Sequence, residues 1–562
     1  MSRDALLSRL QEETFDLLVI GGGITGAGIA RDAALRGLRV ALVEKSDLAH
    51  GTSSASSKLI HGGLRYLEQL ELGLVREGVR ERGLLMKNAP HLARPLPFLF
   101  PIYEDARVGT LQVRIGMWLY DLLSGFSSHK LHRMLARRKA REAEPELLER
   151  GLRGAAVYYD CLTQDARLTL ETALDAEDHG ALVATYVEAA EFTTDAAGKT
   201  TGALVRDRLA GDGPANDGGG GQPFPLRARV TALAAGPWTD RLLKAKLGRD
   251  LLRPTKGSHL VVDRARLPIE HAVVLTHPSD GRVMFAIPWG ARTVVGTTDT
   301  DEGEPPDGLE ASRADVDYML AIANRYFPRA QLGHADVIAT WSGLRPLMGA
   351  SDDLDPSEVS REHAILNVDP GLVAIAGGKL TTYRLMSEQL VDKVVKKLGY
   401  KVKLEPCRTQ TTPLRGASDP QALRDLDACA RELAREEALD EDVALHLIAS
   451  YGLKARDVLA AGQAARTRPG RLVKDLPYLV DEVAYAVTRE KAERLDDVLR
   501  RRTLVFLQDR EQGLSVCEET ARIMAELKGW DRDRTALEVA RYRGLVEASR
   551  AWQRQGAPAP AA

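Results

Sequence analysis

The segment from residue 14 to residue 44, TFDLLVIGGGITGAGIARDAALRGLRVALVE, constrains the fold more strongly than any other part of the chain. Residues 15–20 form an apolar run of strand length, and residues 24–36 carry the small side chains of a closely packed helix. A second apolar run at residues 40–43 ends at Glu44. This order predicts a βαβ unit of a Rossmann-like domain: a strand, a glycine turn, a helix, a second strand and an acidic residue.

The glycines of this turn have the spacing of a dinucleotide-binding fingerprint. Gly21 permits a tight turn, Gly23 lets a pyrophosphate approach backbone N–H groups, and Gly26 allows close contact between helix and strand. The helix N-terminus favours the negative phosphates. Glu44 stands where a carboxylate accepts hydrogen bonds from ribose hydroxyls. We therefore predict dinucleotide binding, although this pattern alone does not distinguish FAD from NAD.

The next segment, SDLAHGTSSASSKLIHGG at residues 46–63, is rich in small hydroxyl side chains, especially at residues 52–57. Such side chains supply short hydrogen-bond donors, which suit an extended cofactor that crosses the domain. A solvated surface loop is the alternative. The segment ends at Gly62 and Gly63, where the backbone can approach a neighbouring group closely because glycine has no Cβ.

The composition limits the classes of function that remain. With 562 residues, the chain is long enough for several domains. Its net charge of −2 gives no basic excess for binding nucleic acid. The four cysteines have no CxxC spacing, so the sequence predicts neither a zinc site nor a disulfide framework. The sequence lacks a signal-peptide core and an apolar run of roughly 20 residues, so we expect any membrane contact to be peripheral.

Strand and helix signals predict a fold of the α/β plus α class with three parts. A junction of strand, glycine and helix recurs near residues 230–239 and again near residues 372–385, so we expect a discontinuous Rossmann-like domain. Residues 253–298 have the pattern of an antiparallel sheet, and helical periodicity dominates from residue 407. The predicted parts are a dinucleotide-binding domain (14–90, 150–250 and 340–400), an antiparallel-sheet substrate domain (91–149 and 251–339), an all-helical C-terminal domain (405–553) and a disordered tail (554–562).

Several segments, taken in order, resemble one family. They are the N-terminal fingerprint, GTSSASSKLIHGGLRYLE, AAGPWTD, KGSHLVV, IPWG, VGTTDTD, SGLRPL, GGKLTTYRLM and DVLRRRTLVF. The chain is similar to the FAD-dependent glycerol-3-phosphate dehydrogenases, within the D-amino-acid-oxidase-like flavoproteins. The resemblance implies noncovalent FAD, oxidation of glycerol 3-phosphate to dihydroxyacetone phosphate by hydride transfer from C2 to flavin N5, and electron transfer to a membrane quinone. It also implies a cytoplasmic enzyme, peripheral on the cytoplasmic face of the inner membrane.

The resemblance also gives roles to individual residues. His259 is the candidate base for the hydroxyl proton; His61 is a weaker rival, and a histidine merely bonded within a sheet is the alternative. Arg345 would neutralise charge on the C2 oxygen, and Lys379 would act on that oxygen or on the reduced flavin. The predicted substrate ligands are Arg65, Tyr66, Arg361 and Thr298. The predicted cofactor ligands are Gly21, Gly23, Gly26, Glu44, Thr52, Ser53, Ser57, His61, Gly62, Gly63, Gly236, Gly378, Lys379 and Thr381.

Some features leave alternatives open. Residues 111–123 are apolar and residues 130–141 are basic, so they form either a membrane-surface segment or a core helix beside a solvated one. A glycerol-3-phosphate oxidase, which uses O₂, shares the motifs, although the extra insertion typical of that group is not seen between residues 256 and 345. An amine or amino-acid oxidase, or a tRNA-modifying or structural FAD protein, is a further rival. The oligomeric state stays open, with a homodimer among the alternatives.

Overall fold

The structure of the chain is a computed structural model. It describes residues 1–64, 67, 71–106, 108–125, 129–210, 220–277, 280–301, 306–349, 363–399 and 404–555. Three predicted substrate ligands, Arg65, Tyr66 and Arg361, lie outside the described residues, and so does most of the predicted tail. Their roles stay predictions.

The first sheet has a parallel centre. Among the described residues it contains eight strands in the order β17-β18-β10-β1-β2-β7, with β9 beside β10 and β8 beside β9. The pairs around β1, β2, β7, β10 and β18 are parallel. The strands are β1 (Thr14–Ile20), β2 (Val40–Val43), β7 (Leu182–Ala184), β8 (Val187–Thr194), β9 (Thr200–Asp207), β10 (Phe224–Leu233), β17 (His363–Asp369) and β18 (Leu372–Gly377). Because three separate stretches of chain supply them, the predicted discontinuous Rossmann-like domain is confirmed.

Helices cover both faces of this sheet. On one face α2 (Ile24–Leu35), α7 (Asp165–Asp178) and α10 (Tyr383–Leu398) pack around alternate residues of β1. The close approach of α2 to α10 requires Gly28, because a Cβ there would lie 2.4 Å from the Ser387 hydroxyl oxygen. On the other face α1 (Arg3–Glu12) and α8 (Thr239–Leu247) contact the remaining residues of the same strand. The alternation follows from the two-residue repeat of a strand.

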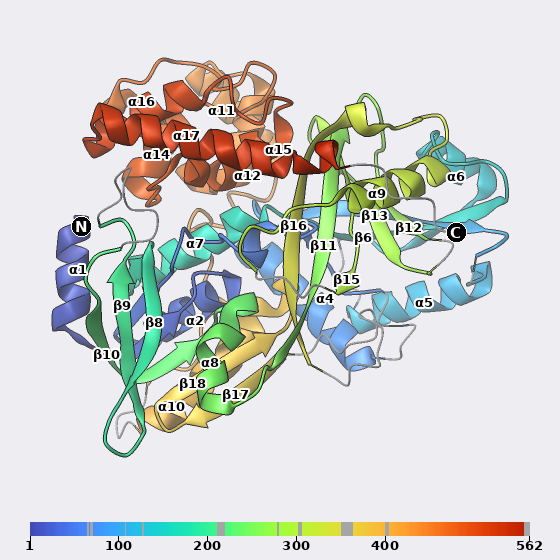
Figure 1. Cartoon of the computed structure of the whole chain (residues 1–562). Coiled ribbons are helices and arrows are strands. Elements are labelled where there is room, and N and C mark those ends of the chain that lie inside the picture. Colours follow the sequence, from blue (N-terminus) through green and yellow to red (C-terminus); the bar gives the residue numbers. More distant parts are fainter. Residues whose placement is uncertain are drawn as a thin grey trace.

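The second sheet is mainly antiparallel. Its ten strands among the described residues follow the order β15-β11-β14-β13-β12-β4-β6-β3, with β16 beside β11 and β5 beside β6. The long strands β11 and β16 run side by side through the middle of the molecule (Figure 1). The strands are β3 (Leu59–Ile60), β4 (Arg94–Tyr103), β5 (Arg133–Ala136), β6 (Leu152–Leu162), β11 (Leu252–Asp263), β12 (Ala272–Thr276), β13 (Val283–Trp289), β14 (Arg292–Gly296), β15 (Thr300–Asp301) and β16 (Val337–Met348). The accompanying helices are α4 (Leu72–Asn88), α5 (Thr110–Leu123), α6 (Arg137–Ala143) and α9 (Arg313–Tyr326).

Three strands belong to a different sheet from the one that the predicted boundaries imply. β3 and β6 fall in the predicted cofactor segments 14–90 and 150–250, and β16 crosses the predicted boundary at residue 340, yet all three pair within the second sheet. An apolar pattern does not identify the partner of a strand, because burial against either sheet selects the same residue types. The domain boundaries themselves stay a prediction.

Residues 404–555 form helices joined by loops, as the sequence predicted. In Figure 1 this orange to red part lies over one end of both sheets. A shared apolar core joins it to the second sheet. The helices are α11 (Leu426–Glu437), α12 (Glu441–Tyr451), α13 (Ala455–Ala465), α14 (Asp481–Arg489), the π-helical turn η6 (Asp497–Arg502), α15 (Val505–Gln508), α16 (Cys517–Lys528) and α17 (Arg532–Ser549).

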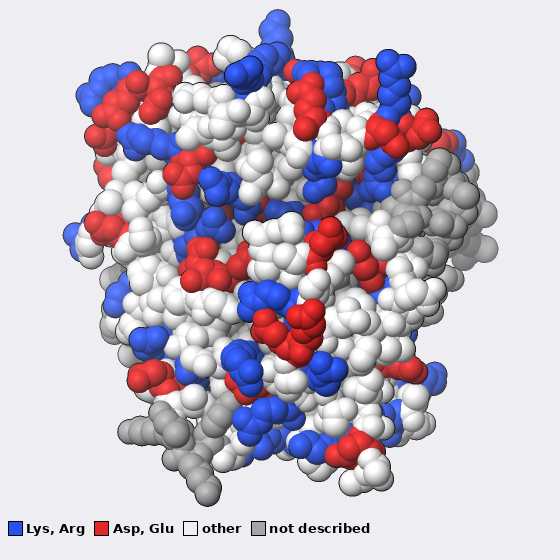
Figure 2. Space-filling model, turned by 90° about the vertical axis from the view of Figure 1, so that its left-hand side faces the viewer, with Lys and Arg blue, Asp and Glu red and all other residues white. Residues whose placement is uncertain are grey.

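The surface charge is mixed, in agreement with the net charge of −2. Figure 2 shows one face on which Lys and Arg side chains are interspersed with Asp and Glu. Within the described ranges, no helix combines the length and the apolar character that crossing a bilayer requires.

Candidate active site

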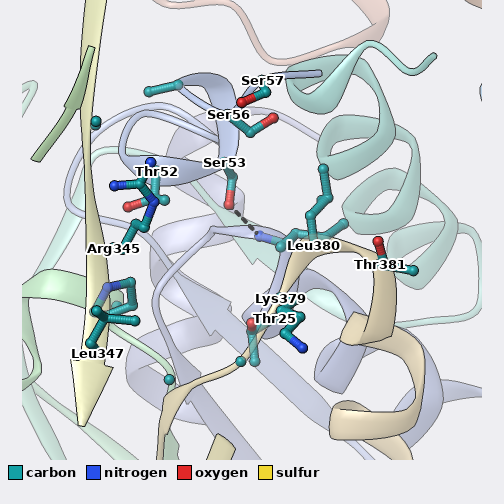
Figure 3. A pocket seen from close by; sticks show the side chains of 18 of the residues that line it. Thr25, Thr52, Ser53, Ser56, Ser57, Arg345, Leu347, Lys379, Leu380 and Thr381 are labelled. Carbon is teal, nitrogen blue, oxygen red and sulfur yellow. Dashed lines mark hydrogen bonds between the residues drawn. The ribbon is translucent and has the colours of Figure 1, made fainter. Parts of the chain in front are cut away.

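A cavity of about 1160 Å³ lies where the two sheets meet. Small-molecule sites typically measure roughly 300–1,000 Å³, so this cavity can hold a dinucleotide and a small substrate together. Figure 3 shows how separate segments surround it. Arg345 and Leu347 extend from β16 on one side, and Lys379 and Thr381 come from the segment after β18 on the other. Residues 52–57, the hydroxyl-rich loop, lie above them.

The turn between β1 and α2 can be built only with glycine. Gly21 has a φ of +114°, and a Cβ on it would lie 2.4 Å from the carbonyl oxygen of Ala234. A Cβ on Gly26 would lie 1.9 Å from the carbonyl oxygen of Gly21. Gly23 is the N-cap of α2 and provides no side-chain hydrogen bond to the helix. The turn therefore presents backbone N–H groups and the positive end of α2 to the cavity.

Glu44 lies beside this turn at the end of β2. One carboxylate oxygen accepts a hydrogen bond from the backbone N–H of Gly22 at 2.6 Å, and the other accepts from that of Ser46 at 2.9 Å. A carboxylate oxygen can accept more than one hydrogen bond. Glu44 lines the cavity, and its predicted role as an acceptor for ribose hydroxyls stays a prediction.

The hydroxyl-rich loop connects the glycine turn to the second sheet. It begins with the short helix η1 (Thr52–Ser54). Ser53 accepts a hydrogen bond from the backbone N–H of Ile24 at 2.9 Å, which is the dashed line in Figure 3. The hydroxyl of Thr52 donates to the carbonyl oxygen of Leu344 at 2.6 Å, next to Arg345. The loop is thus bonded to both sides of the cavity and is no solvated surface loop.

His259, on β11, is buried beside this loop. Its Nε2 lies 2.8 Å from the hydroxyl oxygen of Ser57. Its ring stacks on the indole of Trp341, with 4.7 Å between ring centroids and 10° between planes. The opposite side is occupied by Gly296, where a Cβ would lie 2.3 Å from the imidazole Cδ2. The ring orientation is therefore fixed by packing on both faces.

The environment of His259 keeps its imidazole neutral. Its pKa is lowered well below the ordinary value, mainly by burial and further by the positive charges of Arg345 and Lys58. Its Nδ1 is buried and has no hydrogen-bond partner among the described residues. A neutral imidazole in the cavity can accept a proton, which a cationic one cannot.

Arg345 is held in a fixed orientation at the cavity wall. Its Nη1 donates to Asp299 Oδ1 at 2.8 Å, and its Nη2 donates to Thr297 Oγ1 at 3.2 Å and to the carbonyl oxygen of Thr298 at 3.3 Å. The guanidinium lies over Gly257 of β11, where a Cβ would come within 2.5 Å of Nη2. The missing side chain at Gly257 therefore makes the space that Arg345 occupies.

The segment after β18 closes the cavity from the other side. Gly378 has a φ of +91°, and Lys379 precedes the short helix η4 (Leu380–Thr382). The hydroxyl of Thr381 donates to the carbonyl oxygen of His61, and the backbone N–H of His61 donates back to it, both at 3.2 Å. These bonds join the C-terminal segment of the first domain to the segment that follows the hydroxyl-rich loop.

Gly62 approaches protein atoms instead of the cavity. A Cβ on it would lie 2.4 Å from both the hydroxyl oxygen of Tyr120 and a methyl carbon of Val79. Its N–H donates to Tyr120 at 3.1 Å and to Asp160 at 3.3 Å. The sequence correctly indicated a close approach at this position, but it could not show that the approaching group is part of the protein. Gly63, with a φ of +78°, does line the cavity.

Most of the predicted site residues meet in this one cavity. Gly26 and Gly62 are not among its described lining residues, because both pack inside the protein. The predicted residues that line it are Gly21, Gly23, Glu44, Thr52, Ser53, Ser57, His61, Gly63, Gly236, His259, Thr298, Arg345, Gly378, Lys379 and Thr381.

The sequence did not reveal the residues that hold the predicted site residues in position. Asp165, at the start of α7, accepts hydrogen bonds from Ser56 N and Oγ at 3.0 and 2.7 Å and from Lys58 Nζ at 2.8 Å. It thereby orders the loop that presents Ser57 to His259. A buried aspartate at a helix start has no distinctive sequence signal, because acids are common there.

Residues 16–384 match the family of FAD dependent oxidoreductases, and residues 407–535 match the C-terminal domain of alpha-glycerophosphate oxidase. The aerobic glycerol-3-phosphate dehydrogenase of Staphylococcus saprophyticus is 35% identical over 94% of this chain and 94% of its own. The chain belongs to the FAD-dependent glycerol-3-phosphate dehydrogenase family. A second relative in this family, glycerol-3-phosphate dehydrogenase 2 of Mycobacterium tuberculosis, is 40% identical over 96% of this chain and 89% of its own.

The fold is also that of a solved member of the family. The structure of glycerol-3-phosphate dehydrogenase from Bacillus halodurans, complexed with FAD, is 32% identical, covers 99% of both chains and has a TM-score of 0.79. The chain is an FAD-dependent oxidoreductase. Its residues fit that cofactor, because the glycine turn, the N-terminal end of α2 and Glu44 face a cavity of sufficient volume. The predicted family, cofactor and fold class are confirmed.

Proposed function

We propose that this chain oxidises sn-glycerol 3-phosphate to dihydroxyacetone phosphate and passes the electrons to a membrane quinone. The main support is that His259, Arg345 and Lys379 line the same cavity as the dinucleotide-binding turn and Glu44. A phosphorylated polyol needs cations for its phosphate and a base for its hydroxyl proton, and both kinds of group are present. The relatives' names support the same substrate.

The chemistry divides between cofactor and protein. FAD, when bound, supplies a hydride acceptor at flavin N5. The protein has to orient C2 of the substrate and remove the hydroxyl proton. His259 is the proposed base because it is neutral and lines the cavity. The Ser57 hydroxyl lies 2.8 Å from Nε2, and we propose that it passes the proton from the substrate hydroxyl to the imidazole.

Arg345 is proposed to stabilise negative charge on the C2 oxygen as the proton leaves. Its fixed orientation favours this role, because preorganised donors need not rearrange during the reaction. Lys379, on the opposite side of the cavity in Figure 3, is the second cation of the proposed site. Arg65, Tyr66 and Arg361 stay the predicted phosphate ligands.

Helix α5 supports a position at a membrane surface. Four of its apolar side chains, Leu111, Ile115, Trp118 and Leu122, are 68%, 59%, 54% and 59% exposed. Their spacing places them on one helical face, while Val113 and Met117 face the protein core. An exposed apolar stripe of this kind is typical of interfacial helices, and α5 lies at the outer edge of the molecule in Figure 1. We expect α5 to contact the cytoplasmic face of the inner membrane.

The basic segment after α5 contributes less to this proposal. Arg138 pairs with Glu142 at 2.5 Å, while Arg137 and Arg141 pair with Glu149 at 3.3 and 2.6 Å. These carboxylates offset part of the positive charge that would attract anionic lipids. The apolar stripe, which has no such compensation, is the stronger argument.

The cavity extends toward the same helix, which supports a lipid-soluble acceptor. Ile115 and Met117 of α5 line it together with Phe98, Phe100 and Phe285 of the second sheet. A quinone ring is apolar and planar, and an aromatic wall of this kind suits it.

Turnover assays on the purified holoenzyme test the proposal. We expect dihydroxyacetone phosphate from glycerol 3-phosphate, no product from glycerol, and reduction of a quinone analogue that outpaces peroxide formation. Peroxide equal to the substrate consumed would show an oxidase instead. Turnover of glycine without turnover of glycerol 3-phosphate would show an amino-acid oxidase.

A further inference from the structure

A cluster of buried charges joins the helical domain to the loop that follows Glu44. Asp47 is fully buried in that loop. Both carboxylate oxygens of Asp47 accept hydrogen bonds from Arg502, one of them at 2.8 Å, and Arg501 Nε donates to the same carboxylate. The two arginines belong to the π-helical turn η6 and are 3% and 2% exposed.

The helical domain fixes these arginines independently of Asp47. Arg501 Nη2 donates to Asp496 at 2.7 Å and also pairs with Asp497. Arg502 Nη2 donates to the carbonyl oxygen of Glu490 at 2.6 Å. A bidentate arginine held in this way imposes a geometry on the carboxylate it binds.

The Asp47 loop in turn contacts the residues that bind the dinucleotide. Glu44 and Lys45, which immediately precede this loop in the chain, line the cavity. The backbone N–H of Ala49 donates to the carbonyl oxygen of Gly22 at 3.1 Å, inside the glycine turn. Ala49 has a φ of +62°, a conformation that a residue with a Cβ adopts only when its surroundings enforce it. Asp47 itself is not among the described residues of the cavity wall.

We propose that Asp47, Arg501 and Arg502 are positioning residues for FAD: the helical domain holds the loop between Glu44 and Ala49 in the shape that the cofactor requires. The affinity for FAD and the docking of the helical domain are then coupled. By thermodynamic reciprocity, bound FAD also stabilises that docking. The inference concerns cofactor retention and is independent of which substrate the enzyme oxidises.

The test compares FAD release from three variant holoenzymes. Asp47→Asn keeps the side-chain shape but removes the charge, and Arg502→Gln removes the bidentate pair. Arg292→Gln is the matched control, because Arg292 is also buried and joins the second sheet to the helical domain. Arg292 donates hydrogen bonds to the carbonyl oxygen of Gln508 at 2.7 Å and to the carboxylate of Asp475 at 3.2 Å. Each holoenzyme is diluted, and release is followed by the rise in free-flavin fluorescence.

We expect Asp47→Asn and Arg502→Gln to weaken FAD binding by about 5–150-fold, the usual range for coupled sites, and Arg292→Gln to leave it within about twofold. Melting temperatures with and without excess FAD give a second readout: the increase caused by FAD should shrink in the first two variants alone. Lower melting temperatures with unchanged FAD release would reduce the cluster to structural support and overturn the proposal. If Arg502→Gln does not fold, Asp47→Asn decides alone, since Arg501 keeps its partners Asp496 and Asp497.

Discussion

The Nε2 atom of His259 lies 2.8 Å from the hydroxyl oxygen of Ser57, so a residue of the second sheet and a residue of the hydroxyl-rich loop form one hydrogen-bonded pair inside the cavity. Trp341 and Gly296 hold the imidazole in place on its two faces. The contact joins the proposed base to the hydroxyl-rich loop at the cavity wall.

Replacing His259 should slow the chemistry without loss of cofactor. In His259→Gln, we expect the rate of flavin reduction by glycerol 3-phosphate to fall about 10²–10⁴-fold, the usual contribution of a general base. FAD should stay bound, because no glycine of the turn is altered. Rapid anaerobic mixing measures the rate, and the flavin spectrum measures occupancy. An unchanged rate in a fully loaded variant would remove His259 from the base role.

The lowered pKa of His259 predicts how stability depends on pH. In the unfolded chain a histidine binds a proton below about pH 6.5, whereas the folded protein keeps His259 neutral down to its lowered pKa. The stability contributed by this difference is present above pH 6.5 and is lost as the pH falls toward the folded pKa. Unfolding of wild type and His259→Gln between pH 8 and 5 should show a steeper loss in wild type. Parallel curves would contradict the buried neutral imidazole.

Filling the space beneath Arg345 should disturb catalysis and leave the fold intact. A Cβ in Gly257→Ala would come within 2.5 Å of Arg345 Nη2 and 2.6 Å of Thr297 Oγ1, so the guanidinium must move. Because a displacement near 1 Å can cost about 10²-fold, we expect kcat/KM to fall by about 10–100-fold. Gly83→Ala is the control, since no atom lies within 4 Å of its added Cβ. Equal kcat/KM in the two variants would show that Arg345 need not hold its position.

The exposed stripe of α5 should mediate binding to lipid. Flotation with vesicles of phosphatidylcholine and phosphatidylglycerol should recover the wild-type protein in the lipid fraction. A variant with Leu111, Ile115, Trp118 and Leu122 all changed to Gln should bind at least about tenfold more weakly, because each buried apolar side chain contributes about 1.5–3 kcal/mol. Leu453→Gln, at a 41% exposed leucine of the helical domain, is the control. Equal recovery of all three proteins would exclude α5 as the contact.

The sequence predicted the elements that depend on local pattern. The expected strand at residues 40–43 is β2 (Val40–Val43), and the expected helix from residue 24 is α2. The sequence also singled out candidate site residues in recognisable motifs, such as His259 and Lys379, and both line the cavity. Each motif combines unusual residue types at close spacing.

Long-range relationships could not be predicted in this way. The pair of Asp47 and Arg502 joins residues 455 positions apart. Arg502 lies in the segment DVLRRRTLVF, but nothing in that segment identifies Asp47 as its partner. β6 belongs to the second sheet because it pairs with β4, and the hydrophobic periodicity of a strand does not show which strand it pairs with. Gly62 shows the same limit, since its close neighbour proved to be Tyr120.

Anaerobic mixing of the purified holoenzyme with glycerol 3-phosphate tests the central claim most directly. The account predicts rapid bleaching of the oxidised flavin absorbance band, and no bleaching with glycerol, which lacks the phosphate that the cations are proposed to bind. A flavin that dithionite reduces but glycerol 3-phosphate leaves oxidised would contradict it.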